Sequence, residues 1–120
     1  MSEGERVPKK NLSNTYAFHI EMATKSGEDF AGDFVVHRPT IRERIRIGVI
    51  EAQELVGLNN IDVITSGLAH WVATFDVVVD KAPVWWKPRE MYDMEVLQAV
   101  YQKYIDYLRE FQELPGTESA

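Results

Sequence analysis

Histidines and carboxylates are the residues of this chain that could bind a metal ion or perform acid–base catalysis. The sequence contains three histidines, His19, His37 and His70, and no cysteine. No two histidines have the close spacing of a metal-binding motif such as H-x-x-x-H, and His70 falls opposite the apolar positions of its segment. The acidic residues offer many pairs, but nothing in the sequence marks two of them as buried. Glycine-rich phosphate loops and nucleophile motifs do not occur, so we expect a protein that is not an enzyme, with no catalytic residue, no metal and no cofactor.

The arginines are concentrated in one short segment. Four arginines and one glutamate between residues 38 and 46 give a local charge of +3, although the whole chain has 13 Lys and Arg against 19 Asp and Glu. These arginines could contact phosphates or a carboxylate-rich partner. Alternatively they form an ordinary solvated face, which their uneven placement around a helix favours. Arg42 and Arg46 are the candidates for steering an acidic partner.

Two apolar pairs are further candidates for partner contact. Trp85 and Trp86 are adjacent in a connector between two prolines. Their ordinary role would be to fix the connector to the core, but adjacent side chains of an extended segment point in different directions, so we expect one of them to remain exposed as an anchor. Ile47 and Ile50 project away from the main apolar arc of their predicted helix. We expect them to form an interaction patch unless the hairpin or the third helix covers them.

The first predicted elements are two strands. Alternation of apolar and polar residues predicts strands over 15–22 and 30–37, and the short turn around Gly27 joins them as an antiparallel hairpin. Because an isolated hairpin is only marginally stable in water, its aromatic face must pack against other elements.

The clearest local signal is the start of a helix at Thr40. Thr40 and Glu43 have the spacing of a capping box, and Gly57 can end the helix in the left-handed conformation. Helical spacing predicts that one arc of this helix faces the core. That arc consists of Ile41, Ile45, Gly48, Val49, Ala52, Leu55 and Val56.

Two more helices follow. The second is predicted from Asn60 to about Lys81, although its valine run favours a strand locally, and the third from Pro88 or Asp93 to about Phe111. The order ββααα predicts an α+β fold, in which an N-terminal antiparallel hairpin is followed by three helices packed on one of its faces. We expect one domain over 14–112, a flexible leader over 1–13 and a flexible tail over 113–120.

Composition and charge exclude several classes of protein. The chain has 120 residues with 45% hydrophobic content, which is enough for one packed domain. No apolar run approaches the roughly 20 residues that cross a bilayer, and no signal peptide is recognisable. The net charge of −6 disfavours nucleic acid as a partner. From position 90 onward the local charge is −5, so opposite poles predict head-to-tail self-association.

Two segments carry a resemblance to a known family. The run DFVVHRPTIRERIRIG over 33–48 resembles the hairpin-to-helix junction of tail assembly chaperones from long-tailed, siphovirus-type bacteriophages. The run APVWWKPREMYDMEVL over 82–97 is similar to the proline-aromatic connector that precedes the last helix in that family. The resemblance extends over about residues 16 to 111.

This resemblance implies a non-enzymatic assembly factor of the host cell cytoplasm that is absent from the mature virion. Such proteins coat the long, apolar tape measure protein before tail tube subunits polymerise around it. Many also exist in a C-terminally extended form that engages the tail tube protein, and the segment after Phe111 is where such an extension would begin. The resemblance supplies no fixed binding residues. A membrane partner and nucleic acid are not expected.

Two other functions are compatible with the sequence. The chain could be a structural virion component, such as a head–tail connector or neck subunit, since these are also small α+β proteins with charged poles. It could also be a nucleic-acid-binding regulator that uses the arginine segment, although no aromatic interleaving accompanies the arginines.

Overall fold

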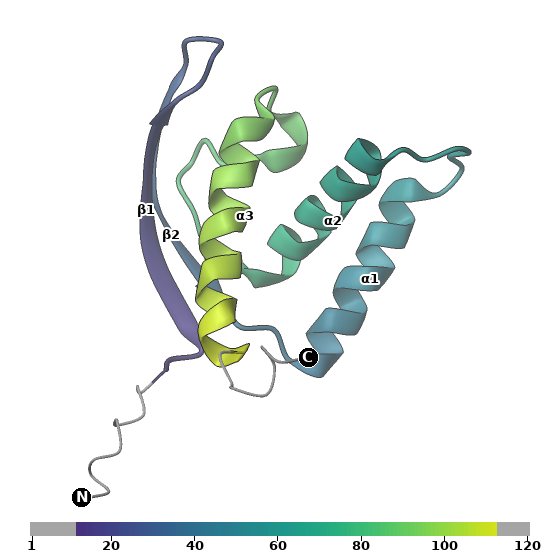
Figure 1. The fold of residues 1–120 in the computed structure, drawn as a ribbon, viewed down its shortest axis with the longest axis horizontal. Helices are drawn as coiled ribbons and strands as arrows, with labels where there is room; N and C mark the ends of the chain where they lie inside the picture. Colours follow the sequence, from purple (N-terminus) through teal and green to yellow (C-terminus); the bar gives the residue numbers. More distant parts are fainter. Residues whose placement is uncertain (1–11, 113–120) are drawn as a thin grey trace, which may run out of the picture.

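The computed structural model describes residues 12–112 and confirms the expected α+β fold of an antiparallel hairpin followed by three helices (Figure 1). Residues 1–11 of the predicted leader and the whole predicted tail, 113–120, lie outside the described residues. Among residues 12–112, no helix is long and apolar enough to cross a membrane.

The sheet contains the predicted hairpin and one further strand. Strands β1 (Thr15–Ala23) and β2 (Asp29–His37) pair antiparallel over their full lengths. Gly27 in their turn has a φ of 95°, which a residue without a Cβ adopts at little cost. A short strand, β3 (Val79–Lys81), pairs antiparallel with β2. The prediction that the second helix continues to about Lys81 is therefore wrong, because the end of the valine run leaves the helix and joins the sheet.

The first helix begins at the predicted capping box. Helix α1 (Ile41–Leu55) is preceded by Thr40, whose hydroxyl accepts a hydrogen bond from the Glu43 N–H at 3.1 Å. The Thr40 N–H in turn donates to the Glu43 carboxylate at 2.9 Å. Gly57 follows the end of the helix with a φ of 83°, as predicted.

The second helix starts slightly later than predicted, whereas the third starts at Asp93, one of its two predicted starts. Helix α2 (Val63–Val78) is capped by Asp62 rather than Asn60, and the Asp62 carboxylate accepts from the Thr65 N–H at 2.7 Å. Helix α3 (Met94–Arg109) follows the predicted connector. The connector contains a 3-10 turn, η2 (Pro88–Glu90), and a second such turn, η3 (Glu110–Gln112), follows α3.

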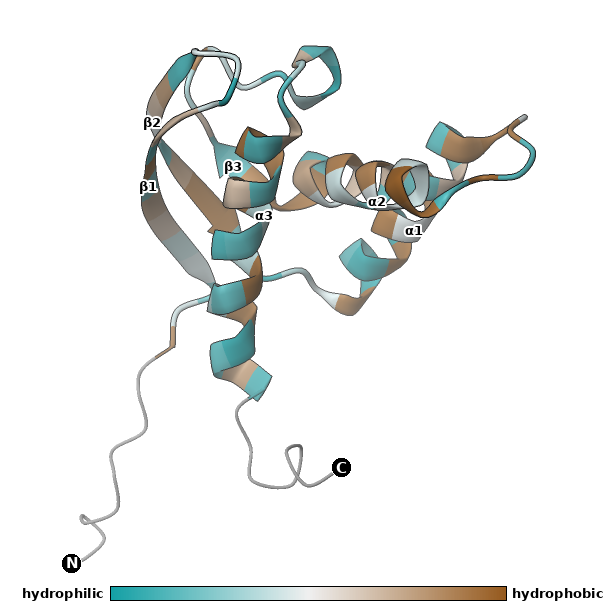
Figure 2. Cartoon of the chain, turned by 45° about the horizontal axis from the view of Figure 1, so that its top comes forward, coloured by the Kyte–Doolittle hydropathy of each residue, from teal (hydrophilic) through white to brown (hydrophobic). Residues whose placement is uncertain are grey.

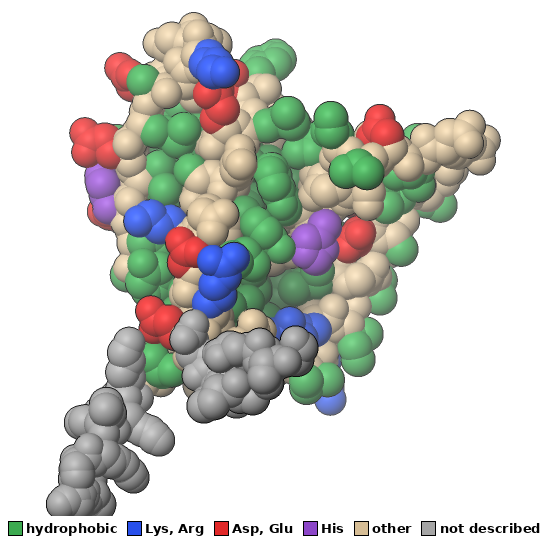
Figure 3. Space-filling model, viewed as in Figure 1, with side chains coloured by type: hydrophobic (Ala, Val, Ile, Leu, Met, Phe, Trp, Pro, Cys, Tyr) green, Lys and Arg blue, Asp and Glu red, His purple; other side chains and the backbone are tan. Residues whose placement is uncertain are grey.

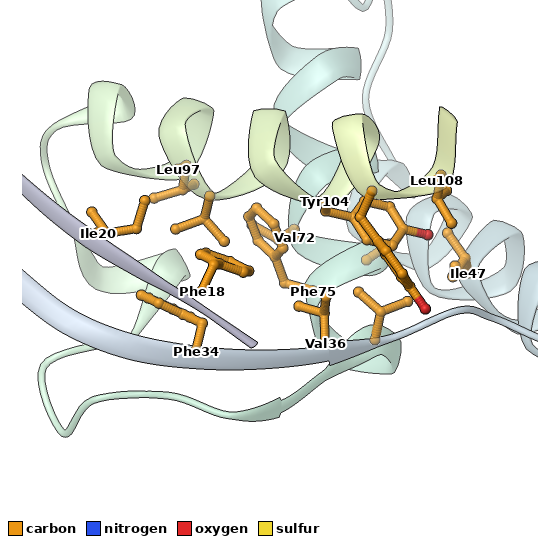
Figure 4. Packing of buried hydrophobic residues seen from close by; sticks show 14 residues of the cluster. Phe18, Ile20, Phe34, Val36, Ile47, Val72, Phe75, Leu97, Tyr104 and Leu108 are labelled. Carbon is orange, nitrogen blue, oxygen red and sulfur yellow. The ribbon is translucent and has the colours of Figure 1, made fainter. Parts of the chain in front are cut away.

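The core lies between the sheet and the helices. Alternate residues of β1 and β2 present Phe18, Ile20, Phe34 and Val36 to α2 and α3, and all four are buried. Figure 4 shows α3 lying across this face of the sheet. The helices contribute Val72, Phe75, Val78, Leu97, Val100, Tyr104, Tyr107 and Leu108 to the same cluster.

The two ends of the described chain meet on the sheet. The hydroxyl of Tyr107, near the end of α3, donates to the carbonyl oxygen of Ser13 at 2.6 Å, and the Tyr107 ring stacks on Tyr16. At the other side of the molecule, α1 is the helix farthest from the hairpin (Figure 1), and it packs mainly against α2. One long side of α1 is consequently left without a neighbour in the described chain.

Candidate binding surface

The outer side of α1 carries a row of exposed aliphatic side chains. Ile41, Ile45, Val49 and Val56 are 75%, 65%, 51% and 78% exposed, and their spacing of four, four and seven residues aligns them along one side of a helix. We call these four residues the outer row. Large aliphatic side chains grouped in this way cost free energy in water unless a partner covers them.

The outer row continues into the turn that joins α1 to α2. Leu58 and Ile61 in the turn, and Val63 and Ile64 in the first turn of α2, are also exposed. Figure 2 shows hydrophobic residues along α1 and at this tip, and Figure 3 shows hydrophobic side chains following the α1 edge of the molecule. The outer row and these four residues together form the outer apolar surface.

This arrangement reverses the predicted orientation of α1. Ile47 is only 7% exposed and lies beside Leu108 in the core (Figure 4), while Ile50 is partly buried against the same cluster. The prediction that Ile47 and Ile50 face away from the core is therefore wrong. Of the arc predicted to be buried, only Leu55 is partly buried, and the other residues face solvent.

Three glutamates explain why α1 turns its richer apolar arc outward. Glu43 contacts His37 at 3.1 Å, Glu51 contacts the Nδ1 of His70 at 3.0 Å, and Glu54 contacts the Nε of Arg89 at 2.9 Å. All three glutamates lie on the inner side of α1, together with Ile47 and Ile50. A 180° rotation of the helix would separate each carboxylate from its partner.

The arginines of this segment remain on the outside. Arg42, Arg44 and Arg46 are exposed, and none of them has an ion-pair partner among residues 12–112. Arg38 instead lies 4.0 Å over the ring of Phe111. Arg42 and Arg46, the predicted steering residues, are thus exposed and form no salt bridge with the described part of the chain.

Trp85 and Trp86 fix the connector to the core. The indole N–H of Trp85 donates to the Ala31 carbonyl at 3.0 Å, and its ring contacts Phe30 and Phe34. Trp86 contacts Phe34 and Phe75 edge-on. Both side chains are only partly exposed, so the expectation that one of them remains outside as an anchor is wrong.

The histidines each lie beside carboxylates. His19 contacts Asp33 at 2.8 Å on the outer face of the hairpin, and its hydrogen bond to the Asp33 carboxylate raises the pKa of His19. His70 contacts Glu51, as described above. Among the described residues, no group of three His, Asp or Glu side chains is arranged to hold a metal ion.

His37 has the most constrained environment of the three. Its Nδ1 lies 2.9 Å from Asp80 on β3, and its Nε2 lies 3.1 Å from Glu43 on α1. Partial burial lowers the pKa of His37, but the hydrogen bonds and charges of Asp80 and Glu43 outweigh this effect and raise it. Only an imidazolium can donate from both ring nitrogens at once.

A cavity of about 370 Å³ lies between the end of α1, α2 and the start of α3. Leu55, Leu68 and Leu97 are among its apolar lining residues. Its one basic group, Arg89, is held by Asp76 at 2.7 Å and by Glu54 at 2.9 Å. Because both carboxylates pair with Arg89, this cavity offers no unpaired basic group to a ligand, in contrast to the outer side of α1.

Sequence reasoning missed the outer row as a binding candidate although it identified every residue of that row. The signal that could have revealed it was the set of glutamates on the opposite side of the helix. No protein-family model, no curated protein and no solved structure matches this chain.

Proposed function

We propose that this protein is a non-enzymatic tail assembly chaperone of a long-tailed bacteriophage, which coats the tape measure protein while the tail is built in the host cell cytoplasm. The observation that carries this proposal is the outer apolar surface. A chaperone of this kind needs an accessible apolar face and no active site, and α1 presents such a face on a separately packed core.

The surface also has the dimensions of a helix-binding site. The 15 residues of α1 span about 22 Å at 1.5 Å per residue, which is roughly four turns of a partner helix. A long partner could accommodate many copies of the protein along its length. Recruitment of the tail tube protein would fall to a C-terminally extended form, which the resemblance implies.

Co-expression with the tape measure protein of the same phage tests the proposal. We expect the tape measure protein to stay soluble and to co-purify with the chain. The double variant Ile45→Ser/Val49→Ser should abolish this effect, because it removes two members of the outer row. The matched control is Val84→Ser/Tyr92→Ser, which changes two side chains that are 92% and 97% exposed but lie on the connector.

Purified virions provide the second measurement. Mass spectrometry should detect no copy of this protein, because a chaperone leaves before the tail is complete. Its presence at a fixed copy number would contradict the proposal and favour a head–tail connector or neck subunit. An insoluble tape measure protein in the presence of the unaltered chain would also contradict it.

A further inference from the structure

We propose that the outer row of α1 binds a single amphipathic helix whose apolar stripe is bordered by Asp and Glu residues. This inference rests on the proposed function, because it assigns the face and the partner chemistry through which a chaperone of this kind would act. It also replaces Ile47, Ile50, Trp85 and Trp86 as the apolar contact residues, since the core holds their side chains.

The apolar part of the argument is the geometry of the outer row. Ile41, Ile45 and Val49 are separated by one helical turn each, and Val56, the C-cap residue directly after α1, extends the row. Such a row packs against the side chains of another helix at the same repeat. Gly48 lies beside the row, and a Cβ built at its position meets nothing within 4 Å, so the centre of α1 leaves room for a bulky partner side chain.

The charged part of the argument is the border of the row. At about 100° per residue, Arg42 and Arg46 lie along one edge and Arg44 along the other. No acidic residue of α1 lies between these edges, because Glu43, Glu51 and Glu54 point inward to His37, His70 and Arg89. Although this chain is acidic as a whole, the outer row is an apolar face with basic borders. Such a face complements a partner helix whose apolar stripe has acidic borders.

The same charges disfavour a second copy of this chain packed face to face through its own α1. Two α1 helices packed face to face would bring the arginines of both copies to a shared interface, while the glutamates of both would stay turned away. Nucleic acid is disfavoured because an aliphatic row between the arginines offers nothing to a phosphate backbone. A helix with Asp and Glu beside its apolar stripe satisfies both parts of the surface.

Two designed helical peptides test this directly with the full chain. Both have about 16 residues, matching the length of α1, and the same Leu and Ile stripe. One is bordered by Glu and the other by Lys, and each carries a fluorescent label for anisotropy. We expect the Glu-bordered peptide to bind about tenfold more tightly, which is the preference that three exposed ion pairs give. High salt should reduce this difference.

Variants locate the site. Ile45→Ser/Val49→Ser should abolish peptide binding without changing the melting temperature, whereas Val84→Ser/Tyr92→Ser should bind as the unaltered chain does. Arg42→Glu/Arg46→Glu should reverse the preference toward the Lys-bordered peptide. Circular dichroism of each variant confirms that the helices are intact.

Several results would overturn the inference. Equal affinity for the two peptides, or no binding of either, would exclude the acidic helix. A dimer in sedimentation that Ile45→Ser/Val49→Ser converts to monomers would assign the row to a second copy. Binding of a DNA oligonucleotide that requires Arg42 and Arg46 would assign it to nucleic acid. Failure of the tape measure protein to bind, with the peptide results as expected, would contradict the proposed function alone.

Discussion

The Nε2 of His37 lies 3.1 Å from the carboxylate of Glu43, so the last residue of β2 holds the same side chain that closes the cap of α1. Glu43 thus accepts from the Thr40 backbone and from an imidazole at once. The backbone hydrogen bond of Thr40 is the main reason that the pKa of Glu43 is lowered, and His37 adds to the effect. This carboxylate therefore links the end of the hairpin to the start of α1.

Stability should depend on pH through His37. Its folded-state pKa is raised above the ordinary 6.5, so the imidazolium stabilises the fold. This contribution is fully present below 6.5 and is lost as the pH rises through the raised value. The difference in free energy of unfolding between the unaltered chain and His37→Gln should therefore shrink with rising pH. His19→Gln is the control, since its ion pairs are exposed and contribute little. A constant difference across this range would exclude the imidazolium as the stabilising form.

Serine substitutions on the two sides of α1 should lower the free energy of unfolding by different amounts. Ile47→Ser/Ile50→Ser removes core contacts and should lower the free energy of unfolding by about 2–5 kcal/mol, as other large-to-small core changes do. Ile41→Ser/Ile45→Ser changes the same residue types on the exposed side and should leave it nearly unaltered. Urea unfolding of the two double variants measures both. Equal losses would mean that α1 is rotated from the orientation described here.

The cap of α1 should be worth a measurable amount. Thr40→Ala removes the hydroxyl that accepts from the Glu43 N–H and should cost about 1 kcal/mol. Thr40→Ser keeps a hydroxyl at the same position and should retain most of the stability. Thermal unfolding distinguishes the two variants, and an equal loss in both would attribute the effect to the Thr40 methyl group instead of the cap.

Two glycines should respond in opposite directions to alanine. A Cβ at Gly32 would overlap the ring of Pro83 and approach Trp85 at 3.4 Å, so Gly32→Ala should displace the connector, lower stability by about 1–3 kcal/mol and change tryptophan fluorescence. Gly48→Ala meets open space inside a helix and should stabilise the protein by up to about 1 kcal/mol. An unchanged fluorescence spectrum in Gly32→Ala would contradict the close packing of the connector.

Local patterns predicted the elements of this fold well. Each correct prediction depends on residues that are close together in the sequence. These patterns are the alternation in β1 and β2, the capping box at Thr40 and the glycine after α1. The strand β3 escaped prediction because Val79 also fits a helical arc. Only pairing with β2, more than 40 positions away by the Val35–Lys81 register, selects the strand.

The orientation of α1 could not be read from its apolar residues. A helical wheel predicts that the side with more apolar residues is buried. On α1 this is the outer row and not the side of Ile47 and Ile50. The partners of Glu51 and Glu54 are His70 and Arg89, which the fold brings close from 19 and 35 positions away. The sequence therefore predicted the exposed apolar residues on the side of α1 that is in fact buried. Arg42 and Arg46 are exposed, as the proposed contact requires.

The hydrogen bond from Tyr107 to Ser13 spans 94 positions of the chain. This contact can form only after Tyr107 has been translated. The hairpin is translated well before α3, whose side chains cover Phe18 and Ile20. A nascent chain must therefore hold an aromatic sheet face without its cover until α3 emerges, because such long-range contacts form only after the intervening segment exists. A chain stalled before Tyr107 would therefore leave exposed the aromatic sheet face that α3 covers in the folded protein.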